Sequence, residues 1–368
     1  MLALSAAMTA CGGGARPSAP RNRPAATNTG RPVSPSRTSP STRAVAARFL
    51  SRYVTGDGRV IRHDQGGDIV SEGQAYAMLI AEVAGQPTWV RTIWSWTSGH
   101  LGRPDGLFAS HASGEGQIQD PQSATDADIL IAYALLRYAG LDQAALHRAG
   151  RRVAEAVLAR ESVKLPDGSL LPVAGPWAKS SSPPTVDPSY LMPGVFVGLA
   201  RLTGDDRWNG AAYAAIALID GLTDGGRRLP PDWAQLADRR LVAIANPGGG
   251  AGVHYGFDAA RLPIWFATAC SARARRLAAG WWTNILASDG RSGPQALTLD
   301  GATVTAAPSP LQIVAGAAAA TAAGEQNAAR ALRARATALA REDPTYYGDA
   351  WVALGPALLD GLISPCNS

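Results

Sequence analysis

The chain has 368 residues, of which 46% are hydrophobic and 17% charged, a composition ordinary for a globular protein with one large core or two smaller ones. Its net charge of +5 includes six arginines in residues 1–45, a segment without Asp or Glu, so residues 46–368 carry −1. The folded part therefore lacks the basic surface that nucleic acids require, and we expect no nucleic-acid partner.

Residues 1–11, MLALSAAMTAC, are apolar and end in a cysteine preceded by small residues, which resembles a bacterial lipoprotein signal. The run is short and has no positively charged start, so a start further upstream, a degenerate signal and a free buried cysteine are alternatives. We expect a lipid anchor at Cys11 as the only membrane attachment, and a location outside the cell or on its surface. Residues 12–41, rich in Gly, Pro, Ser, Thr and Arg, predict a disordered tether because they contain too few large apolar residues to form a core.

From residue 42 onward, apolar residues recur at helical spacing, as at Leu146, Ala149, Val153 and Val157. This pattern predicts twelve helices, at residues 42–54, 71–84, 86–101, 124–139, 142–161, 188–203, 205–223, 255–270, 271–288, 309–323, 325–342 and 346–362.

The connections between these helices alternate in length. Short links such as Gly85-Gln86 and Gly140-Leu141 are typical of antiparallel helix pairs, whereas loops as long as residues 102–123, 162–187, 224–254 and 289–308 are usually functional. There is no fixed repeat length of the solenoid kind. We therefore predict that residues 42–368 form one all-α domain, an (α/α)6 barrel of six helical hairpins, with an open helical-repeat scaffold as the alternative.

In such an up-and-down series the even-numbered helices point the same way, so their N-termini gather at one face of the barrel. Polar or aromatic clusters stand at five of these helix starts: Glu72, Asp126 with Asp128, Asp187 through Tyr190, Asp258, and Tyr346 with Tyr347. Acidic residues are favoured at helix starts for structural reasons alone, since they cap free N–H groups and interact with the helix dipole. Five clusters converging on one cavity nevertheless predict a site.

Local rules separate the roles of these acids. In SEGQAYAM, Ser71 is expected to cap the helix, with Gln74 reaching back to it, and the helix dipole should lower the pKa of Glu72. A proton donor at that position needs burial or neighbouring carboxylates to raise its pKa. Asp128 falls three residues after the expected N-cap Thr125 and is interpreted as structural, which leaves Asp126 as the site candidate.

Two carboxyl groups facing each other in a cleft lined by aromatic rings can hydrolyse a glycosidic bond, a reaction for which we expect neither a cofactor nor a metal. The ten Trp and nine Tyr suit a sugar-binding surface, because such rings stack on the apolar faces of sugars. Trp177 and Trp233, in long loops, are the cleft candidates, whereas Trp94, Trp96 and Trp265 are expected in the core.

Five ordered blocks of sequence resemble the glycoside hydrolases of family 8. They are SEGQAYAM, similar to the family pattern SEGxxYGM, then SATDADILIAYALL, PSYLMP, PDW and FDAARLP, within residues 45–362. The resemblance implies an (α/α)6 barrel and an inverting mechanism. It assigns Glu72 as general acid, Asp258 as general base and Asp126 as the carboxylate that orients the sugar. It also places Tyr190 and Trp233 in the cleft, and Tyr76 and Tyr347 are further candidates for substrate contact.

The chain departs from the family pattern at Ala77, Asp187 and Phe257, which affects the expected substrate more than the chemistry. The function expected is a monomeric, secreted endo-β-1,4-glucanase acting on a β-linked polysaccharide. Xylan, lichenan or chitosan as substrate, and a non-catalytic glycan-binding lipoprotein, are the alternatives. Whether Cys270 and Cys366 pair is left open by the sequence.

Overall fold

The structure is a computed structural model that describes residues 41–249, 252–288 and 292–366. The expected signal at residues 1–11, with Cys11, and the tether as far as residue 40 lie outside the described residues. In the part that is described, no helix is long and apolar enough to cross a membrane.

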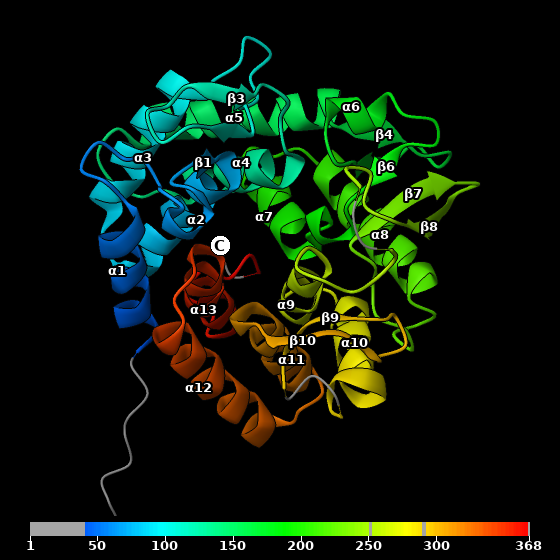
Figure 1. Ribbon diagram of the computed structural model, residues 1–368. Helices are drawn as coiled ribbons and strands as arrows, with labels where there is room; N and C mark the ends of the chain where they lie inside the picture. The colour runs from blue at the N-terminus through cyan, green and yellow to red at the C-terminus, as the bar shows by residue number, and fades with distance from the viewer. Residues whose placement is uncertain (1–40, 250–251, 289–291, 367–368) are drawn as a thin grey trace, which may run out of the picture. The chain divides into compact units, whose positions relative to one another are not determined.

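Six helices form a closed inner ring, in which each helix contacts the next and the last contacts the first (Figure 1). They are α2 (Ser71–Ala84), α4 (Thr125–Arg137), α7 (Pro193–Thr203), α9 (Leu262–Ala267), α11 (Pro310–Ala322) and α13 (Tyr346–Leu359). The outer helices are α1 (Thr42–Tyr53), α3 (Pro87–His100), α5 (Gln143–Arg160), α8 (Arg207–Leu222), α10 (Ala272–Trp281) and α12 (Gln326–Glu342). The prediction of an (α/α)6 barrel is confirmed, and the open scaffold is wrong because the ring closes.

Sequence composition separates the two rings. The inner helix α11, PLQIVAGAAAATA, buries eleven of its thirteen residues, so it is apolar on all sides. The outer helix α12 buries only Ala329, Leu332, Ala336 and Ala340, which lie on one face, and it exposes Arg330, Arg335 and Arg341. An all-round apolar helix is stable only when neighbours surround it, which places α11 inside.

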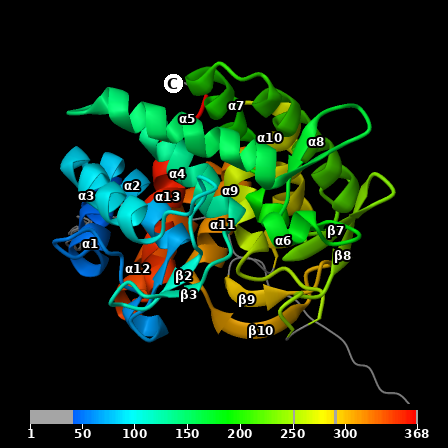
Figure 2. The same ribbon diagram turned by 90° about the horizontal axis from the view of Figure 1, so that it is seen from above.

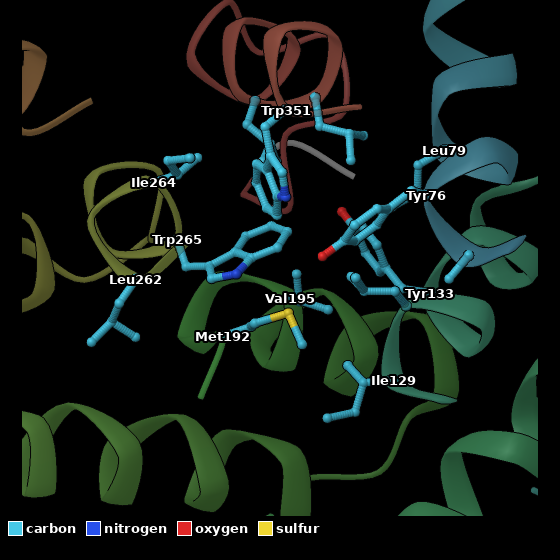
Figure 3. Packing of buried hydrophobic residues seen from close by; sticks show 14 of the residues in the cluster. Tyr76, Leu79, Ile129, Tyr133, Met192, Val195, Leu262, Ile264, Trp265 and Trp351 are labelled. Carbon is cyan, nitrogen blue, oxygen red and sulfur yellow. The ribbon is translucent and has the colours of Figure 1, made fainter. Parts of the chain in front are cut away.

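The centre of the barrel is filled with large side chains (Figure 3). The Trp351 ring packs edge-on against Tyr76 and Trp265, with ring centroids 5.3 and 5.6 Å apart. Trp265 and Trp96 are buried and Trp94 packs against the core, in agreement with the roles expected for them. The centre of the barrel is therefore a packed core.

The described residues include ten short strands, which lie in the long links or just before α2. Figure 2 shows β2, β3, β9 and β10 together on one side of the barrel. The antiparallel sheets are β1 (Ile69–Val70), β2 (His111–Ala112) and β3 (Ile118–Asp120); β4 (Ser162–Lys164) and β5 (Leu170–Pro172); β6 (Thr185–Val186), β7 (Trp233–Ala237) and β8 (Arg240–Ile244); and β9 (Pro294–Leu297) and β10 (Thr303–Pro308). Because β6 pairs with β7, two of the long links are joined to each other.

Three helix boundaries differ from those expected. Residues 188–190 form a separate 3-10 turn before α7, whose first residue, Pro193, has no N–H to continue it. Tyr255 pairs with Leu297 as extended chain, so the eighth helix is reduced to a 3-10 turn, Ala259–Arg261, and α9. The ninth helix continues beyond α10 as a π-helix, Trp282–Leu286. One further helix, α6 (Pro176–Lys179), lies inside a link expected to be non-helical.

Cys270 and Cys366 form a disulfide, with Cα atoms 5.4 Å apart, that joins the turn after α9 to the segment after α13 across 96 residues of chain. A bridge closing a loop of that length restricts the unfolded chain strongly. We expect Cys270→Ser/Cys366→Ser to lose about 2–4 kcal/mol of unfolding free energy in urea titrations. The natural protein treated with dithiothreitol should lose the same amount of unfolding free energy. If the urea midpoint were unchanged both in the variant and in the reduced protein, the disulfide would have no stabilising role.

Candidate active site

A cavity of about 610 Å³ opens where the inner helices begin. Glu72 at the start of α2, Tyr346 and Tyr347 at the start of α13, and Asp258 just before α9 line it. A second hollow of about 320 Å³ shares Phe257, Asp258 and Gln295 with the first and continues to Trp233. The two hollows form one cleft, with Asp258 at their junction.

The start of α2 differs from the expected capping box. Val70, the end of β1, is the N-cap residue, and the buried Ser71 hydroxyl has no hydrogen-bond partner among the described residues. The side chain of Gln74 turns away from the helix start: it accepts from the Val60 N–H at 2.7 Å and donates to the Gly58 carbonyl and the Thr97 hydroxyl. The expectation was wrong because a fully buried amide must satisfy all its polar atoms, and these partners come from distant chain.

Arg261 is the centre of the site. Its guanidinium is 3% exposed and contacts four carboxylates. Its Nη1 donates to Asp126 Oδ2 at 2.7 Å and to Glu72 Oε2 at 3.1 Å. Its Nη2 donates to Asp258 Oδ1 at 3.1 Å and to Asp187 Oδ2 at 3.3 Å. The structure thus brings together all three carboxylates predicted as catalytic.

Sequence reasoning did not identify Arg261, and it named Asp187 as a helix-start residue and as a departure from the family pattern but not as a site residue. The one available signal for Arg261 is a single cation within the apolar run AARLPIWF, since a buried arginine requires anionic partners. Asp187 is fully buried, and its other oxygen accepts from the N–H and the hydroxyl of Ser189.

Asp126 and Asp128 have different hydrogen-bond partners, and the expected N-cap, Thr125, is not observed. Helix α4 is capped by Ala124 without a side-chain hydrogen bond. Asp128 accepts instead from the N–H of Phe108 at 3.1 Å, which anchors the link 102–123 to α4. Asp128 is structural, therefore, through a contact that is distant in sequence, and Asp126 is left to face Arg261.

Burial gives the carboxyl groups of the cleft unequal acidities. Burial, reinforced by Asp126 and Asp258, raises the pKa of Glu72 to about 7 against the opposing charge of Arg261. Burial raises the pKa of Asp258 to about 6, again against Arg261. The helix dipole expected to acidify Glu72 is thus outweighed, and near neutral pH Glu72 retains a proton more readily than Asp258 does.

The predicted aromatic residues occupy two kinds of position. Trp177, 38% exposed, lies with its ring centroid 6.4 Å from that of Trp233, although the two come from different links. Tyr347 lines the larger cavity, and the Tyr190 ring lies beneath Arg261, whose Cζ is 5.4 Å from the ring centroid. Their contacts with sugar stay predictions.

Tyr76 differs from these four. It is fully buried and lines neither hollow, and its hydroxyl accepts from Arg261 Nη1 at 3.3 Å. Its position supports Arg261 and does not agree with the direct sugar contact expected for it. Phe257, 44% exposed beside Asp258, is an aromatic residue of the cleft that the sequence reasoning did not propose.

Among the described residues, no group of three or more His, Cys, Asp or Glu side chains is arranged to hold a metal ion.

The raised pKa of Glu72 predicts how stability changes with pH. A carboxyl group whose pKa is raised from 4.5 to about 7 by folding stabilises the protein below the lower value and loses that contribution as the pH rises through the higher one. The side chain of Glu72→Gln cannot ionise. At pH 8 we therefore expect the unfolding free energy of this variant to exceed that of the natural protein by on the order of 2 kcal/mol, and at pH 4 we expect the two proteins to have similar unfolding free energies. Urea titrations at both pH values measure this.

Glu155→Gln, at a surface position where the carboxylate is 60% exposed, is the matched control and should change little at either pH. A Glu72→Gln variant that is less stable than the natural protein at pH 8 would contradict the raised pKa.

A closed ring of helical hairpins carrying two carboxyl groups of unequal acidity in an aromatic-lined cleft fits the class of enzymes that cleave glycosidic bonds. Residues 36–355 match the sequence profile of the glycosyl hydrolases family 8, and the chain belongs to that family.

A probable endoglucanase of Novacetimonas hansenii is 29% identical over 236 residues, which cover 60% of this chain and 65% of that relative. Two solved structures have the same fold. The endo-beta-1,4-glucanase CMCax from Acetobacter xylinum has a TM-score of 0.71 at 23% identity, covering 88% of this chain and 99% of that one. The beta-1,3-1,4-glucanase from Paenibacillus sp. X4 has a TM-score of 0.76 at 20% identity, covering 87% and 91%.

Proposed function

We propose that this protein is an endo-acting β-1,4-glucanase that hydrolyses its substrate with inversion of configuration. The observation that carries the proposal is the pair Glu72 and Asp258. The two carboxyl groups contact different nitrogens of the buried Arg261 guanidinium. Both have raised pKa values, and Glu72 is the weaker acid of the two. The names of the relatives, which are endoglucanases, support the substrate class.

In this mechanism Glu72 donates its proton to the leaving glycosidic oxygen, while Asp258 removes a proton from a water that attacks the opposite face of the sugar. Inversion requires the two carboxyl groups to stand about 6.5–9.5 Å apart, and a nucleophile would stand at about 5–5.5 Å. Both carboxyl groups contact Arg261, each through a different nitrogen, and the anomer released first distinguishes the two separations. Asp126, fixed by Arg261, orients the sugar at the cleavage point.

The open cleft supports internal cleavage of a polymer. The two hollows meet at Asp258, so sugar units can bind on both sides of the reacting bond. Trp177 and Trp233 supply ring faces near the second hollow, and Tyr347 lies in the first. We propose that the protein works as a monomer, because the carboxylates described here all come from one chain.

The test is a reducing-sugar assay of the full chain on carboxymethylcellulose, xylan, lichenan and chitosan, followed by proton NMR of freshly cut product. We expect the highest rate on β-1,4-glucan, with the α-anomer appearing first. First release of the β-anomer would contradict inversion. A preference for xylan or chitosan would change the substrate assignment, and binding without any cleavage would favour the non-catalytic glycan-binding alternative.

We further propose that the enzyme acts outside the cell or at its surface, attached through a lipid at Cys11. The Cys270–Cys366 disulfide supports an oxidising compartment. Labelled palmitate should be incorporated into the natural protein and not into Cys11→Ala, and equal labelling of both would contradict the anchor.

A further inference from the structure

Asp232 holds the loop that carries Asp258. One of its carboxylate oxygens, Oδ1, accepts from the N–H of Gly256 at 2.9 Å and from the N–H of Ala259 at 2.8 Å. These two residues flank Phe257 and Asp258, so a single oxygen fixes the backbone on both sides of the proposed base. The Asp232 N–H also donates to the His254 carbonyl at 3.0 Å, which fixes the start of the same loop.

The other oxygen of Asp232 faces an imidazole. Asp232 Oδ2 lies 3.1 Å from His254 Nε2, and the side chains are 12% and 19% exposed. The second ring nitrogen, Nδ1, faces the carbonyl of Gly252. Both partners are acceptors, so all of these contacts are satisfied when one hydrogen lies on Nδ1 and another lies between Nε2 and the carboxylate. In that arrangement the pair holds one proton more than a neutral imidazole and a carboxylate hold together.

Close packing fixes this arrangement. A Cβ atom at position 256 would lie 2.4 Å from Asp232 Oδ2 and 2.9 Å from the His254 ring, so only glycine fits between the pair and the loop. Gln312 holds the loop from the other side, because its amide donates to the carbonyls of Gly256 and Gln295 at 3.1 and 3.0 Å. His254, Asp232 and Asp258 line the same 320 Å³ hollow.

We propose that Asp232 and His254 are a positioning pair for Asp258, in which Asp232 fixes the loop geometry and the proton shared with His254 sets the pH range over which Asp258 accepts a proton. This inference rests on the proposed function, in which Asp258 is the base.

Two charges of opposite sign act on Asp258 from this pair: Asp232 raises the pKa of Asp258, and His254 lowers it. The other charged or titratable groups facing Asp258 are Arg261, Asp126, Glu72, Asp187, Tyr190 and Tyr347. With its shared proton the pair is neutral overall, so removing either member should shift the titration of Asp258, and the two shifts should have opposite signs.

The experiment measures kcat/KM on a soluble β-1,4-glucan between pH 4 and pH 9. His254→Gln leaves an unbalanced negative charge, so we expect the acidic limb of the profile to move up by roughly 0.5–1 pH unit. Asp232→Asn keeps an oxygen for the two N–H groups and removes the negative charge, so the limb should move down. Asp232→Ala removes both, and we expect kcat to fall by about tenfold or more with KM nearly unchanged.

His147→Gln, on the outer helix α5, is the control, because His147 faces the Tyr138 carbonyl and lines neither hollow of the cleft, and it should leave the profile unchanged. Shifts of the same sign in His254→Gln and Asp232→Asn, or unshifted limbs in both, would overturn the electrostatic role. An Asp232→Ala variant that folds by circular dichroism and keeps its full kcat would overturn the positioning role.

A measurement made without substrate tests this inference separately from the proposed function. Nitrogen-15 NMR of the His254 ring should show hydrogen on both nitrogens at pH 6, and a displaced Nε2 resonance in Asp232→Asn. If the natural protein cleaves no polysaccharide but shows this pattern, the proposed function fails while the pair stands. Hydrogen on only one nitrogen at pH 6 would overturn the pair whatever the activity.

Discussion

Asp258→Asn is expected to lower kcat on β-1,4-glucan by about 10²–10⁴-fold while leaving oligosaccharide binding nearly unchanged, because the amide cannot take a proton from the attacking water. Glu72→Gln should lose a similar factor on the polymer, since the leaving sugar oxygen must be protonated. The two variants are distinguished by an aryl β-cellobioside whose phenolate leaves without protonation. On that substrate Glu72→Gln should recover most of its activity, and Asp258→Asn should not.

Asp224→Asn is the matched control for this experiment. Asp224 is 66% exposed and has a positive φ, a conformation that asparagine tolerates as well as aspartate, so folding and turnover should be unchanged. The assignment of acid and base would be reversed if Asp258→Asn, and not Glu72→Gln, recovered on the aryl substrate. If both variants kept turnover within tenfold of the natural protein, neither Glu72 nor Asp258 would be catalytic.

Arg261→Met is expected to be the most destabilising single substitution in the cleft. It removes the guanidinium that contacts four carboxylates and leaves their charges buried without that partner. Breaking a buried ion pair in this way costs about 3–5 kcal/mol. The loss should be greatest at pH 8, where Glu72 and Asp258 are ionised, and smaller at pH 5, where protonation of these two groups reduces the repulsion.

Urea unfolding of Arg261→Met at pH 5 and pH 8 measures both effects. Arg261→Lys keeps a positive charge without the planar group that contacts several carboxylates at once, so it should recover only part of the loss. Arg273→Met, which removes an exposed ion pair with Asp220, should change stability by less than about 1 kcal/mol. An equal loss for Arg261→Met at both pH values would show that packing, and not charge, is what Arg261 supplies.

The sequence by itself determined the ring of helices and the position of its acids. Helix formation follows a local period, so the spacing of apolar residues predicted helices at 309–323 and 325–342, where the structure has α11 and α12. Alternating short and long links then placed one set of helix starts at a single rim. Glu72, Asp126 and Asp258 stand at or just before those starts, and the resemblance to family 8 assigned their roles.

Only the tertiary structure decided which partners the buried polar groups have. Arg261 meets Glu72 across 189 residues of chain and Asp126 across 135, and Gln74 bonds to Val60 and Thr97 where a local rule predicted a capping box. A buried polar group must find a hydrogen-bond partner, and the fold supplies that partner from chain remote in sequence. The sign of the Glu72 pKa shift has the same origin: the helix dipole is local, whereas the burial and the neighbouring carboxylates that outweigh it exist only after the barrel has closed.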